Sequence, residues 1–135
     1  MGVSRKMRGA FAALVSVFWM TAAPHALADV KDYQFELIQS DVKSGGEVTV
    51  SVRLINKKTG KPVPDAVIFA KRIDMAPDGM AEMKEPIEEI ASTEPGVYRF
   101  KTNIPMAGRW QLSLGAKIQG EAGTVESKLV VKATP

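Results

Sequence analysis

Residues 47–55 read Glu-Val-Thr-Val-Ser-Val-Arg-Leu-Ile. Valine or leucine occupies every second position of this stretch up to residue 54, and the positions between are charged or hydroxylated. Because successive side chains of a β-strand point to opposite faces, the alternation predicts a strand with one buried and one solvated face. Residues 109–118 repeat the pattern with Trp110, Leu112 and Leu114 on one face, so we expect Trp110 in the core.

Segments with similar alternation recur along the chain, separated by glycine- and proline-containing turns. The expected strands are residues 33–39, 47–55, 66–73, 85–91, 97–102, 109–118 and 124–132. A turn about every 8 to 12 residues is typical of an antiparallel β-sandwich. No stretch of helical periodicity or linker divides the chain, so we expect one all-β domain of about seven strands.

The N-terminus has the organisation of a cleavable signal peptide. Arg5, Lys6 and Arg8 precede an apolar run over residues 10–23, and Ala26-Leu27-Ala28 supplies small residues at a cleavage site. We therefore expect residues 1–28 to be removed and residues 29–135 to work as an exported domain in the periplasm or cell envelope. The mature form would contain no membrane span.

Removal of this segment changes which functions the composition allows. The chain has 18 basic and 15 acidic residues, and the segment takes three of the basic ones, so the mature domain is formally neutral and gives no reason to expect nucleic-acid binding. There is no cysteine, and the single histidine, His25, lies within residues 1–28. Nucleophilic triads and histidine or thiolate metal sites are thus excluded from the mature domain, and we expect it not to be an enzyme.

Four methionines remain after cleavage. Met75, Met80 and Met83 fall in the longest stretch without alternation, residues 74–84, which we expect to be a loop, and Met106 falls in a short connection. None is expected at an inward strand position. If the chain reverses at every connection, these two connections and residues 44–46 share one end of the sandwich, where the side chains can converge.

Thioether sulfur is a soft, neutral ligand that favours Cu(I) over Ca²⁺ or Mg²⁺. It also does not protonate in the working pH range, so such a site would keep its metal in mild acid. Two interpretations stay open at this point: the methionines form a soft-metal site, or they pack over the end of the core, as methionine commonly does.

Several segments together resemble the YtkA-like domains, which are related to FixH-type proteins. They are residues 48–63, the loop 75–83, Pro95-Gly96-Val97-Tyr98, and Ile104-Pro105-Met106-Ala107-Gly108-Arg109-Trp110. The resemblance implies an immunoglobulin-like sandwich exported to the envelope and associated with heavy-metal efflux or copper-oxidase assembly. It also implies that the family's methionine-rich loop corresponds to Met75, Met80 and Met83, and its M-A-G-x-W methionine to Met106. Family members often carry histidine in this loop; its absence here favours Cu(I) over Cu(II).

Two hypotheses follow. The first is an envelope Cu(I) carrier in which Met75, Met80, Met83 and Met106 bind the ion and pass it to a membrane protein of metal efflux or oxidase assembly. The alternative is a metal-free interaction module whose apolar methionine surface docks on an envelope membrane protein.

Overall fold

The computed structural model describes residue 2 and residues 30–135. The predicted signal peptide lies outside the described residues, apart from residue 2. No helix among the described residues is long and apolar enough to cross a membrane.

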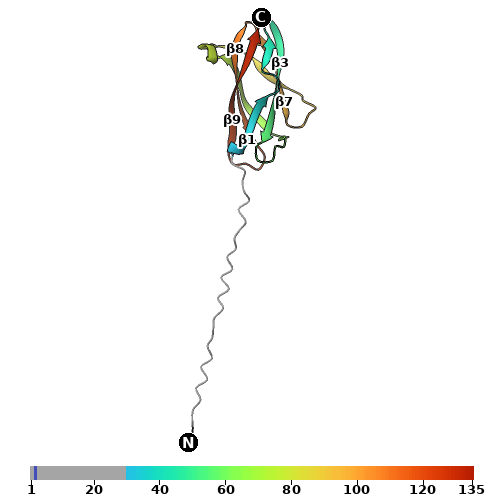
Figure 1. The fold of residues 1–135 in the computed structure, drawn as a ribbon, viewed down its shortest axis with the longest axis vertical. Coiled ribbons are helices and arrows are strands. Elements are labelled where there is room, and N and C mark those ends of the chain that lie inside the picture. Colours follow the sequence, from blue (N-terminus) through green and yellow to red (C-terminus); the bar gives the residue numbers. More distant parts are fainter. Residues whose placement is uncertain (1, 3–29) are drawn as a thin grey trace.

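The described chain is almost entirely β-structure (Figure 1). Its elements are η1 (Val30–Asp32), β1 (Tyr33–Leu37), β2 (Asp41–Lys43), β3 (Gly46–Asn56), β4 (Val67–Met75), η2 (Ala76–Asp78), β5 (Met80–Glu85), β6 (Ile87–Ile90), β7 (Val97–Ile104), β8 (Gly108–Lys117) and β9 (Thr124–Thr134). One sheet has the strand order β1-β3-β7-β6 and the other β2-β9-β8-β4-β5. The predicted immunoglobulin-like sandwich is confirmed, with nine strands among the described residues instead of about seven.

The two additional strands, β2 and β5, arise at two places where the chain passes from the outer strand of one sheet to the outer strand of the other without reversing direction. β1 pairs with β3 in the first sheet, and β2, a few residues later, pairs with β9 in the second, in parallel orientation. Likewise β5 pairs with β4, and after Pro86 the chain continues as β6 against β7. Neither of these two crossings reverses the chain. The connections that do reverse it therefore still alternate between the two ends of the sandwich, as the sequence predicts.

The core lies between the sheets and is built from the alternating positions of the long strands. Val50, Val52 and Leu54 of β3 are at most 1 % exposed, and so are Trp110 and Leu112 of β8. The prediction that Trp110 is a core residue is therefore confirmed, and because the indole ring is enclosed it offers no face to a surface ligand.

The Pro95-Gly96-Val97-Tyr98 segment contacts the β3–β4 connection at one end of the sandwich. The Tyr98 hydroxyl donates to the carbonyl of Val63 at 2.8 Å and accepts from the backbone N–H of Ala66 at 2.9 Å. Burial raises the pKa of this hydroxyl above its ordinary value. Tyr98 thus holds the β3–β4 connection on the sandwich.

Candidate functional site

Three connections meet at one end of the sandwich, which we call the methionine end: residues 44–45, 76–79 and 105–107. The N–H of Gly45 donates to the carbonyl of Ile104 at 2.8 Å, and the N–H of Arg109 donates to Oδ2 of Asp78 at 2.7 Å. In Figure 1 the β4–β5 hairpin, coloured yellow-green, projects beside β8 near the C-terminus. The connections that the sequence places together do lie together.

The stretch predicted as a loop, residues 74–84, is instead a hairpin, and this part of the prediction is wrong. β4 continues to Met75, η2 forms the tip with Pro77 near its start and Gly79 in the left-handed conformation (φ 75°), and β5 returns from Met80. The backbone between the methionines is therefore fixed by sheet pairing.

Asp78 fastens this tip to β8. Its Oδ1 accepts from Nε of Arg109 at 2.8 Å, and the Nη2 of Arg109 donates to the carbonyl of Pro77 at 2.7 Å. Hydrogen bonds from the backbone and side chain of Arg109 hold the pKa of Asp78 below its ordinary value. Sequence reasoning missed this pair because its members are 31 positions apart in the chain.

Gly108 makes the close contact between hairpin and β8 possible. A Cβ on this residue would lie 2.5 Å from the Cε methyl of Met75 and 2.8 Å from Oδ2 of Asp78. Gly108 also has a φ of 143°, which side-chain-bearing residues rarely adopt. The glycine of the M-A-G-R-W segment therefore serves packing at the methionine end.

Met75 belongs to the core, contrary to the prediction that none of the four methionines points inward. Its side chain is 1 % exposed and packs in the central cluster of buried residues. Met80 is its direct partner across the β4–β5 ladder, and its half-buried side chain packs against the same cluster. The packing interpretation therefore accounts for Met75 fully and for Met80 in part.

Met83 lies in a bulge of β5. The ladder passes from the pair Met75–Met80 directly to the pair Asp74–Lys84, so residues 81–83 have no partners on β4. Because of the bulge, Met83 lies next to the Asp74–Lys84 pair, which directly follows the Met75–Met80 pair in the ladder. Its side chain is 38 % exposed.

Met106 has a fixed backbone and a free side chain. The indole Nε1 of Trp110 donates to the carbonyl of Met106 at 3.1 Å, which holds the connection above the buried ring. The Met106 side chain is 40 % exposed. The fold thus uses the carbonyl of this residue and leaves its thioether accessible to solvent.

The nearby carboxylates are engaged in the hairpin. Oδ2 of Asp74, a buried residue, accepts from Nε of Arg72 at 2.6 Å, and Oδ1 accepts from the N–H of Ala76 at 2.9 Å. Burial raises the pKa of Asp74, but these hydrogen bonds and the charges of Arg72 and Lys128 outweigh it, so the pKa lies below its ordinary value. Across the described residues, no three His, Cys, Asp or Glu side chains gather to hold a metal ion.

Asp74→Asn is expected to lower the free energy of unfolding near pH 7 by roughly 1 to 3 kcal/mol, because it weakens hydrogen bonds to a buried charge. A folded-state pKa below the unfolded value of about 3.9 contributes stability above that value and loses it as the pH falls through the folded pKa. The deficit should therefore shrink below about pH 4. Urea unfolding followed across this range measures it, with the exposed Glu82→Gln as control. A deficit that stays constant down to strongly acid pH would show that the charge of Asp74 contributes nothing.

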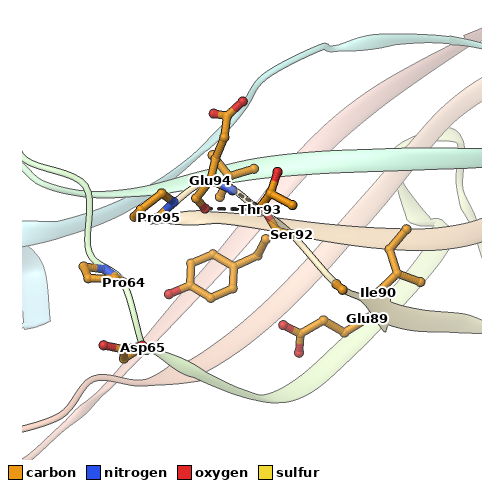
Figure 2. Close-up of a pocket in the computed structure, with 12 residues that line it drawn as sticks. Pro64, Asp65, Glu89, Ile90, Ser92, Thr93, Glu94 and Pro95 are labelled. Atoms are coloured by element: carbon orange, nitrogen blue, oxygen red, sulfur yellow. Dashed lines mark hydrogen bonds between the residues drawn. The ribbon is translucent and has the colours of Figure 1, made fainter.

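A hollow of about 420 Å³ opens at the opposite end of the sandwich, between the β3–β4 and β6–β7 connections (Figure 2). Asp65, Glu89 and Glu94 line it, but the Glu94 side chain points away from the other two. These carboxylates do not converge on one point, so the methionine end remains the candidate site.

Comparison with known families assigns the chain. The family model described as YtkA-like matches residues 27–115. The chain belongs to the YtkA-like family. The match covers all four methionines and both the P-G-V-Y and M-A-G-R-W segments, so the resemblance predicted from these segments is confirmed.

Solved structures with similar folds are distant from this YtkA-like chain. The Lin-41 filamin domain aligns with a TM-score of 0.48 and 13 % identity, covering 78 % of this chain and 95 % of that one. The ZirS C-terminal domain aligns with a TM-score of 0.47 and 14 % identity, covering 79 % and 68 %. None of the curated proteins compared matches this chain.

Proposed function

We propose that this YtkA-like domain is an exported carrier, not an enzyme, that binds Cu(I) through thioethers at its methionine end and passes the ion to a membrane protein of metal efflux or oxidase assembly. The observation that carries the proposal is the accessibility of Met83 and Met106, which are 38 % and 40 % exposed. The hairpin that carries Met83 is joined at its tip to Arg109, three positions after Met106, through Asp78. Soft sulfur in this arrangement suits Cu(I). Membership of the family supports the same reading.

The four predicted ligands divide into two groups. Met83 and Met106 present exposed side chains, and Met80 presents a half-buried one, so these three are the proposed ligands. Met75 packs in the core with its methyl group against Gly108. Its part in the site is therefore to support Met80, its neighbour across the β4–β5 ladder. Accessible ligands on a surface suit an ion that must be handed on.

The test is a competition for Cu(I) with a chromophoric chelator under reducing, anaerobic conditions, at about pH 7 and pH 5. The protein is expressed from its full coding sequence and purified in the form the cell retains. We expect one ion per chain at both pH values, because thioethers do not exchange metal for protons. Replacing Met80, Met83 and Met106 together by leucine should abolish binding while preserving the fold, since leucine keeps volume and apolarity.

Met75→Leu is the matched control, because it removes a sulfur from the same hairpin without touching the exposed ones. It should leave the affinity for Cu(I) within about threefold of wild type. Copper that stays entirely with the chelator in the wild-type titration would contradict the carrier proposal.

The same exposure also favours a second candidate, the metal-free module that docks on an envelope membrane protein. Exposed methionine side chains provide adaptable apolar contact area. The triple leucine variant separates the two candidates, since leucine retains the apolar surface and docking would survive the substitution that abolishes copper binding.

A further inference from the structure

The first two-thirds of strand β4 form an open edge of its sheet. β5 pairs with Ile73, Asp74 and Met75, and the chain then leaves for the other sheet at Pro86. Residues 67–72 therefore pair with β8 on one side and, within the described part of the chain, with no strand on the other. An open edge of this length is a template for another strand.

Large apolar side chains accompany this edge. Val67 is 60 % and Phe69 55 % exposed, the highest values among the large hydrophobic residues that the structure describes. Phe69 lies in a bulge of β4, with its ring over Gly115: a Cβ there would lie 2.9 Å from Cζ of Phe69. The ring is thus held on the outer face of the sheet, where a neighbouring strand could cover it.

The order of charges makes the segment complementary to itself. Residues 65–72 read Asp-Ala-Val-Ile-Phe-Ala-Lys-Arg, with an acidic start, an apolar middle and a basic end. Asp65 and Lys71 are exposed, and neither forms an ion pair with another described residue. An antiparallel second copy would bring each Asp65 to the Lys71 end of its partner and apolar middle onto apolar middle.

A second copy of β4 fits beside the open segment, because the segment is bounded at both ends. At Asp65 the backbone turns with a φ of 62° and leaves the sheet, and at Ile73 the place beside β4 is taken by Glu85 of β5. A second β4 running antiparallel would enter the gap at one limit and turn away at the other. Neither copy would have to displace β5.

From these features we propose that two copies of this chain pair through the open edges of β4, antiparallel, joining their five-stranded sheets into one. The bulge at Phe69 and the lysine on the edge weaken such pairing, so the dimer is of the small, reversible class. The two methionine ends then point in opposite directions, and copper binding at each is independent of dimer formation.

Sedimentation velocity over a wide concentration range tests the proposal, using the full chain as the cell retains it. We expect the mass to double reversibly with concentration, and hydrogen exchange of the amides of residues 67–72 to slow as the dimer forms. Phe69→Lys should remove the dimer, while circular dichroism shows that the sandwich remains. A wild-type protein that is monomeric at all concentrations, or a Phe69→Lys protein that still dimerises, would overturn the proposal.

A double-mutant cycle tests the antiparallel arrangement. Asp65→Asn keeps a residue that accepts the left-handed backbone, and Lys71→Gln keeps the side-chain length. Each should raise the dissociation constant about fivefold, as expected for losing two exposed ion pairs. The double variant should be no weaker than either single one, because both remove the same contacts. Effects that multiply in the double variant would rule out the Asp65–Lys71 pairing.

Discussion

Trp110→Ala is expected to lower the free energy of unfolding by about 3 to 5 kcal/mol, the range for removing a large aromatic side chain from a core. The indole ring is 0 % exposed and lies under the Met106 connection. Its removal leaves a cavity between the sheets and takes the hydrogen bond from the Met106 carbonyl. Urea unfolding followed by circular dichroism measures the loss, because the substitution also removes the main fluorescent group of the domain.

Trp110→Phe separates the two contributions. It keeps an aromatic ring in the core but has no N–H for the Met106 carbonyl, so we expect a smaller loss of about 1 to 3 kcal/mol. In the copper competition this variant should bind Cu(I) less tightly than wild type even though it stays folded, since the Met106 connection loses the hydrogen bond that supports it. If the free energy of unfolding of the alanine variant lay within about 1 kcal/mol of the wild-type value, the core would not be organised around this ring.

Gly96→Ala is expected to lower the free energy of unfolding by about 2 to 4 kcal/mol, through left-handed backbone strain and overpacking together. Gly96 has a φ of 80°, and a Cβ there would lie 2.4 Å from Cβ of Pro62. The N–H of Leu54 also donates to the carbonyl of Gly96 at 2.9 Å, so the backbone has little room to move. Chemical unfolding of the variant and wild type under the same conditions gives the difference.

Gly60→Ala is the matched control for this substitution. Gly60 has a similar φ of 72°, but a Cβ on it would meet nothing within 4 Å. It should therefore show only the strain of the left-handed backbone, about 1 to 2 kcal/mol. Equal losses in the two variants would mean that the contact between Gly96 and Pro62 contributes nothing.

The long strands were predictable because each has one face in the core and one in water. β3 and β8 alternate cleanly, and each of the seven expected segments overlaps a strand of the structure. β2 is three residues long, and β5 is bulged and exposed along most of its length, so neither leaves a period-two pattern in the sequence. Such strands are defined by their partners, which a local pattern does not reveal.

The role of Met75 was mispredicted for a related reason. The bulge at Phe69 interrupts the alternation of β4, and the strand was expected to end at residue 73, so Met75 was assigned to the loop that was expected to follow. The signal that could have corrected this is the spacing of Ile73 and Met75, which are two residues apart and both buried. Their parity continues the strand through the stretch that was predicted to be a loop.

The resemblance identified the family, and the structure shows what its most specific segments do for the fold. Gly96 and Tyr98 fasten one end of the sandwich, and Gly108 and Trp110 fasten the other. The side chain of Met106 lies within one of these segments but carries none of that structural work. The ion pair between Asp78 and Arg109 could not be predicted, since it depends on how hairpin and β8 meet in space.

The two crossings between outer strands, β1 to β2 and β5 to β6, affect how the sandwich resists force. β1 and β6 are the outer strands of one sheet, β2 and β5 are the outer strands of the other, and a short covalent link joins β1 to β2 and β5 to β6. The backbone therefore links the two sheets at each edge of the sandwich. A force that slides one sheet over the other must stretch both of these links before the core can shear. The two sheets are therefore joined covalently along both edges, although the domain has no disulfide.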